Sequence, residues 1–187
     1  MTAALAIASL VFTGGCIASL VYLHVSPTGY SPVRNAVSEY GVGAYADWYR
    51  LQAACAGTAA IFLAGALAKG VHPAPRTVIS LLLVLAAARI AIGRFTTDLI
   101  GSTERTREGA IHALLAVAAF TSASWAGVAL KPAQHGQPAL GWTMALFALG
   151  TFLAVRRLPL KPWLGLIERC YYVAMLAWLV LVAARLI

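Results

Sequence analysis

The chain has 187 residues and a formal net charge of +8, and 61% of its residues are hydrophobic while 11% are charged. Ordinary soluble domains carry about 25% charged residues, so this composition excludes a water-soluble globule. The basic excess does not indicate nucleic-acid binding, because the sequence has no groove-reading motif and no long run of Lys or Arg.

Six apolar stretches follow one another along the chain, and each reaches or approaches the about 20 residues needed to cross a bilayer. They cover residues 2–23, 49–68, 77–93, 110–130, 138–155 and 163–184. They lack the alternation of a barrel strand, and backbone groups in lipid must be paired within the segment, so we expect helices. Every gap contains Pro, Gly or charge, as turns in water do. The sequence therefore predicts an all-α, multi-pass cell-membrane protein with a single domain over residues 1–187, a bundle of six transmembrane helices.

The three cysteines lie inside apolar stretches and lack the C-x-x-C spacing of a metal or redox site. Cys16, Cys55 and Cys170 are therefore expected to act as small buried hydrophobic residues. Gly14 and Gly15 before Cys16 loosely resemble a lipoprotein cleavage site. However, the first ten residues contain no Lys or Arg, so we expect the first stretch to remain as a helix.

The polar residues are distributed unevenly between the gaps. All six acidic residues lie in or near the gaps at 24–48, 94–108 and 156–161. Consecutive spans alternate in direction, so these three gaps are expected on one side of the membrane, with both termini on the other. Most Lys and Arg residues also lie near these gaps, and the positive-inside rule then favours a cytoplasmic location for this polar side.

Candidate site residues come from all three polar gaps. If the first gap is helical, Asn35, Ser38 and Glu39 lie on adjoining positions of one turn. Arg94 and Asp98 are four residues apart, so they can pair if the third helix continues that far.

Further candidates lie just inside the fourth and sixth stretches. His112 is about one turn inside its helix, where an ionisable side chain faces protein or a wet cavity, so we expect it to point towards Asp98 or Glu39. Glu168, Arg169 and Tyr172 share one stripe of the last helix.

Unpaired charge is costly at this depth in a membrane. We therefore expect the deep arginines and the acids of the polar side to form one connected network, made of Arg89, Arg94, Arg169, Glu39, Asp98 and Glu168.

Three functions remain open at this point. In the first, the protein binds or processes a lipid head group, with Ser38, Glu39, Asp98 and His112 as catalytic residues and Asn35, Arg94, Glu168, Arg169 and Tyr172 as ligand-binding residues. In the second, Glu39, Asp98, His112 and Glu168 titrate in the cavity of a small-molecule or proton-coupled transporter. In the third, the charges merely pair in a structural or partner-stabilising subunit. The expected partners are membrane lipids and a lipid or small-molecule ligand.

No metal or cofactor is predicted. A zinc hydrolase needs three ligands, and the polar side offers only His24 and His112 as histidines. Haem ligation by paired histidines is also disfavoured, because His72 and His135 lie in the opposite gaps.

The residues Asn35 to Gly41 read NAVSEYG, and Phe95 to Asp98 read FTTD. Together with a His at the start of the fourth helix and the run Gly165 to Arg169, they resemble an uncharacterised integral-membrane family, domain of unknown function 998. The resemblance covers essentially the whole chain and implies a small multi-helix membrane protein with these polar positions on one side. It implies no activity. The sequence is also loosely similar to membrane hydrolases of the alkaline-ceramidase and progestin-receptor type. It departs from them in its last helix, which lacks their histidine pair.

Overall fold

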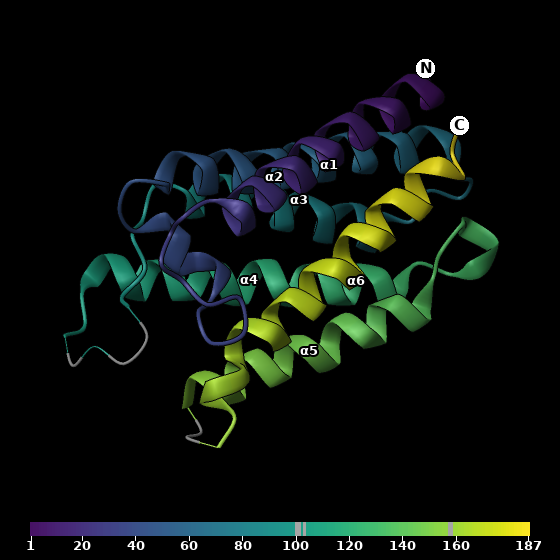
Figure 1. Cartoon of the computed structure of the whole chain (residues 1–187). Helices are drawn as coiled ribbons and strands as arrows, with labels where there is room; N and C mark the ends of the chain where they lie inside the picture. Colours follow the sequence, from purple (N-terminus) through teal and green to yellow (C-terminus); the bar gives the residue numbers. More distant parts are fainter. Residues whose placement is uncertain (100–101, 103, 157–158) are drawn as a thin grey trace.

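The computed structural model describes residues 1–99, 102, 104–156 and 159–187. Within these residues the chain is helical and contains no strand, which confirms the all-α prediction (Figure 1). The α-helices are α1 (Thr2–Val25), α2 (Ala46–Gly70), α3 (Arg76–Ile92), α4 (Arg107–Ala129), α5 (Pro138–Arg156) and α6 (Leu164–Ala184). Short 3-10 helices are η1 (Val37–Gly41), η2 (Pro132–Gln134) and η3 (Lys161–Trp163).

In the described part of the chain, five helices are long and apolar enough to cross a membrane: α1, α2, α4, α5 and, counted from Lys161, α6. Helix α3 has 17 residues. At about 1.5 Å per residue it is about 26 Å long, slightly short of a hydrocarbon layer of about 30 Å. Large apolar side chains cover the outside of the bundle; Leu114 and Val173 are each 69% exposed. This surface suits lipid, so the membrane nature of the chain is supported.

Each helix packs against the next one in the chain, and α6 closes the arrangement by packing against α1. Figure 1 shows both termini at one end of the bundle. The loops between α1 and α2 and between α3 and α4 lie at the other end, which we call the polar end. The termini and these loops therefore lie at opposite ends of the bundle, as the predicted placement on opposite sides of a membrane requires.

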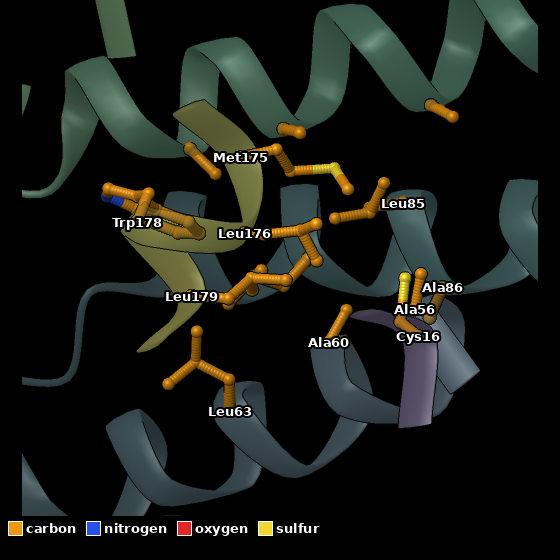
Figure 2. Packing of buried hydrophobic residues seen from close by; sticks show 14 of the residues in the cluster. Cys16, Ala56, Ala60, Leu63, Leu85, Ala86, Met175, Leu176, Trp178 and Leu179 are labelled. Carbon is orange, nitrogen blue, oxygen red and sulfur yellow. The ribbon is translucent and has the colours of Figure 1, made fainter. Parts of the chain in front are cut away.

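Small residues let the helices approach closely, as is common in membrane bundles. A Cβ atom on Gly57 of α2 would lie 2.9 Å from the Ala86 carbonyl oxygen of α3. Figure 2 shows Ala56 and Ala60 of α2 among the side chains of α1, α3 and α6, including the fully buried Trp178. Cys16 and Cys55 are buried as predicted, whereas Cys170 is half-buried; all three are free thiols.

Candidate functional site

A cavity of about 490 Å³ lies at the polar end, between α2, α3, α4, α5, α6 and the loop that carries η1. Its polar lining comes from these elements and from the chain between α3 and α4: Ser38, Tyr49, Arg89, Thr97, Asp98, Arg105, Thr106, His112, Thr151, Arg156, Glu168 and Tyr172. Five of the residues predicted from the sequence are therefore brought together here, namely Ser38, Asp98, His112, Glu168 and Tyr172. The other four, Asn35, Glu39, Arg94 and Arg169, are not among the described lining residues.

Arg89 forms the deep end of this site, and its side chain is only 2% exposed. Its Nη1 donates to the Tyr172 hydroxyl at 2.8 Å, and its Nη2 donates to Gln52 Oε1 at 2.8 Å. The Gln52 amide in turn donates to Cys16 Sγ at 3.3 Å. The expected network placed Arg89 among the acids, but its hydrogen bonds to the described residues go to a phenol and an amide.

His112 of α4 is 3% exposed, so it faces the bundle rather than lipid, as expected. Its Nδ1 lies 2.8 Å from the Phe95 carbonyl oxygen, and its ring is stacked on Tyr49 with the centroids 6.3 Å apart. Its hydrogen bond is to this carbonyl rather than to Asp98 or Glu39, the residues towards which it was expected to point. Because a carbonyl accepts only, Nδ1 carries a proton, and Nε2 is a buried atom without a hydrogen-bond partner in the structure.

Glu168 near the start of α6 is buried, and its Oε2 accepts a hydrogen bond from the Val37 backbone N–H at 2.7 Å. The charges of Arg169 and Arg89 both act on this carboxylate. Glu168 therefore has two functions in the structure: it lines the cavity, and it fixes the first turn of η1.

The remaining polar atoms near η1 hold the segment 32–41, which we call the anchored loop. Asn35 Nδ2 and the Ala36 N–H donate to Glu39 Oε2 at 3.0 and 2.8 Å, so the predicted proximity of Asn35 and Glu39 is present. Arg169 Nη1 donates to the Asn35 carbonyl at 2.8 Å, and Nη2 donates to the Tyr40 hydroxyl at 3.1 Å. These contacts position Ser38, on the same loop, against the cavity.

Asp98 stands at the outer part of the cavity and is connected to the start of α4. The Thr106 hydroxyl donates to Asp98 Oδ1 at 2.7 Å and accepts from the Gly109 N–H at 2.9 Å as the N-cap of the helix. Hydrogen bonding from the Thr106 hydroxyl holds the pKa of Asp98 below its usual value. Asp98 is therefore ionised at neutral pH.

The predicted pairing of Arg94 with Asp98 depended on a longer third helix. Helix α3 ends at Ile92, and Arg94 is exposed, so the two residues do not lie on one helical surface. Asp98 instead pairs with the N-terminus of α4. In the part of the chain that the structure describes, these hydrogen bonds form three groups, the Arg89 cluster, the anchored loop and the Asp98 cap, and the Glu168 carboxylate, on which the charges of Arg89 and Arg169 both act, links the first two.

Several residues of the site were missed by the sequence analysis, among them two on α2. Gln52 and Tyr49, one turn apart on α2, are buried beside Arg89 and His112 respectively. A polar amide inside an otherwise apolar stretch was the available signal for Gln52. For metals, the described residues contain no group of three His, Cys, Asp or Glu side chains suited to holding an ion.

These features define a helical protein of the membrane type with a partly charged cavity at one end of its bundle. The chain belongs to the family described as Protein of unknown function (DUF998), whose profile matches residues 3–185. The resemblance noted in the sequence is therefore confirmed over nearly the whole chain. Comparison with curated proteins and with solved structures gave no significant match.

Proposed function

We propose that this protein crosses the cell membrane six times and uses the cavity at its polar end to bind an amphipathic membrane ligand, a lipid or a lipid-like molecule. The observation that carries the proposal is the lining of the cavity, which joins buried charged residues to an apolar wall. Its volume of about 490 Å³ lies within the range of about 300–1,000 Å³ that is usual for small-ligand sites.

The apolar wall comes from α4 and α5 and leads towards the surface that would face lipid. Ala113, Ala116 and Val117 of α4 line the cavity opposite Phe152 and Leu153 of α5. Val117 is 42% exposed and Leu153 is 40% exposed, so the wall is continuous with the outer surface of the bundle. An acyl chain entering from the bilayer would contact this wall while its head group stays at the charged end.

The sixth span of the proposal is α3. It packs between α2 and α4, which are both long enough to cross, and it reverses the chain between them. Leu83 and Val84 of α3 are 50% and 48% exposed, as expected for side chains that face lipid. Backbone hydrogen bonds at Arg94 and Phe95 continue the turn beyond Ile92 and lengthen the element.

Single-cysteine labelling tests the six spans. In a chain whose three native cysteines are replaced by alanine, Lys69→Cys and Lys131→Cys should react with an impermeant maleimide from one side. Val33→Cys and Thr96→Cys should react from the other side. Labelling of Lys69→Cys and Thr96→Cys from the same side would show that α3 does not cross.

Ligand binding is tested by filling the apolar wall. Ala116→Trp places a large ring in the cavity, whereas Leu114→Trp, two residues away on the same helix, adds the same ring on the outer surface. Native mass spectrometry with dioleoyl phosphatidic acid, phosphatidylcholine and diacylglycerol should show a bound lipid in the wild type and in Leu114→Trp. Ala116→Trp should lose it. Equal binding by the two variants would remove the cavity as the binding site.

A second candidate is an enzyme that acts on the bound lipid, and the unpartnered His112 Nε2 favours it. A neutral imidazole whose Nδ1–H is held by a carbonyl presents Nε2 as a base, and the Ser38 hydroxyl lines the same cavity. Under this proposal, Ser38→Ala abolishes turnover of a lipid ester while lipid binding is retained. Turnover that survives in Ser38→Ala would refute a nucleophilic role for this residue.

A further inference from the structure

The charged end of the cavity contains a buried cation whose hydrogen-bond partners are neutral. Both partners of Arg89, the Tyr172 hydroxyl and the Gln52 amide oxygen, are uncharged, and its Nε has no hydrogen-bond partner in the structure. Removing a guanidinium from water is costly unless charge or hydrogen bonds offset the loss of hydration. The Tyr172 ring, 5.4 Å from the guanidinium carbon, supplies a further part of that compensation.

The acids of the cavity are already engaged by donors of the protein. Glu168 accepts from the Val37 N–H, and Asp98 accepts from the hydroxyl and the N–H of Thr106. Among the described residues, three arginines but only two carboxylates line the cavity: Arg89, Arg105 and Arg156 against Asp98 and Glu168. The cavity therefore has an excess of positive charge, and the hydrogen bonds of its buried cation, Arg89, go to uncharged groups.

His112 adds a second unpartnered nitrogen to the same lining. Its Nε2 is buried and unpaired, although the residue belongs to the cavity wall. A group that carries oxygen atoms and a hydroxyl hydrogen would pair with both residues: an oxygen would accept from Arg89, and the hydroxyl would donate to His112. A singly protonated phosphate monoester has both kinds of atom.

We propose that the cavity selects an anionic oxyacid head group, a phosphate monoester above all, through Arg89 and His112. This inference rests on the proposed function, because it assigns the head group of the ligand that the cavity is proposed to bind. The same chemistry is offered by a phosphorylated lipid and by free inorganic phosphate, and the experiment separates these sources.

The experiment compares dioleoyl phosphatidic acid with dioleoylglycerol, which differ only in the phosphate. Native mass spectrometry of the purified full chain should show tighter binding of phosphatidic acid by at least about tenfold, the size of one charge-assisted hydrogen bond. Arg89→Gln should remove this preference and keep dioleoylglycerol binding. The matched control Arg50→Gln changes an exposed arginine paired with Asp47 and should keep the preference.

The outcomes separate the two proposals. If both lipids bind the wild type equally and Ala116→Trp blocks both, the head-group assignment is overturned while lipid binding in the cavity stands. If Ala116→Trp blocks neither lipid, the cavity proposal itself fails. Should Arg89→Gln not fold, His112→Gln replaces it. A fall of at least about threefold in the preference for phosphatidic acid is then expected from loss of one hydrogen bond, and an unchanged preference overturns the assignment.

Sodium phosphate identifies the source of the anion. Thermal stabilisation of the wild type by sodium phosphate, absent in Arg89→Gln, would indicate that the free anion is sufficient. Stabilisation by phosphatidic acid alone would assign the site to a lipid. Stabilisation of both variants alike by either compound would contradict a role for Arg89.

Discussion

Replacing Gly165 with alanine tests how the anchored loop is held on α6. A Cβ atom at this position would collide with the carbonyl oxygens of Asn35 and Pro32 and would lie 2.9 Å from Arg169 Nη1. Two of these neighbours are backbone atoms of the loop, so the loop must move away. Overpacking of this kind costs about 1–3 kcal/mol. Alanine stabilises a helix by up to about 1 kcal/mol relative to glycine. The net loss of unfolding free energy is therefore about 1 kcal/mol.

The matched control is Gly14→Ala in α1, where a new Cβ atom meets nothing within 4 Å. This variant should gain stability from helix propensity alone, up to about 1 kcal/mol. Thermal unfolding in detergent, followed by circular dichroism, should therefore move in opposite directions for the two variants. At about 2–4 °C per kcal/mol the midpoints should differ by several degrees. A Gly165→Ala protein as stable as Gly14→Ala would show that the loop does not rest on α6.

Three further predictions concern the polar contacts. Glu168→Ala leaves the buried Val37 N–H without its acceptor and should cost about 1–3 kcal/mol of unfolding free energy, whereas Glu168→Gln keeps an oxygen and should cost less; equal losses would contradict the hydrogen bond. Tyr172→Phe removes the acceptor of a buried guanidinium and should lower stability by a similar about 1–3 kcal/mol, with the neutral effect of an exposed Tyr22→Phe as reference. Because the folded pKa of Asp98 lies below its unfolded value of about 3.9, its contribution is complete above that pH and is lost as the pH falls through the folded pKa. The stability difference between wild type and Asp98→Asn should therefore shrink on acidification below about pH 4, and a difference independent of pH would exclude the ionised contact.

The arrangement of the helices was largely predictable, because apolar length in a membrane is a local property of the sequence. The predicted stretch 138–155 corresponds to α5 at Pro138–Arg156, and the predicted 2–23 corresponds to α1 at Thr2–Val25. The end of α3 was less predictable. Gly93 and Arg94 follow Ile92 without a proline, and the stop became apparent only in the structure.

The partners of the site were harder to predict, since they lie far apart in the chain. Glu168 and Val37 are hydrogen-bonded although 131 positions separate them in the sequence, and Arg169 and Asn35 are hydrogen-bonded across a separation of 134 positions. Neither local segment contains a pattern that predicts these contacts. For Arg89, the cost of burying an unpaired positive charge favoured a carboxylate partner. The Tyr172 hydroxyl and the Gln52 amide oxygen nevertheless accept its hydrogen bonds. Electrostatic reasoning found which side chains needed partners, while packing decided which partners they obtained.

The two hydrogen bonds of Arg89 also set an order of events during synthesis. Gln52 precedes Arg89 by 37 positions, so it has already been made when the arginine leaves the ribosome. Tyr172 follows Arg89 by 83 positions, and at about 5–20 residues per second it emerges about 4–17 seconds later. During that interval Gln52 is the only one of these two hydrogen-bond partners that has been synthesised. The two acceptors of Arg89 therefore become available in sequence, Gln52 before the arginine and Tyr172 after it.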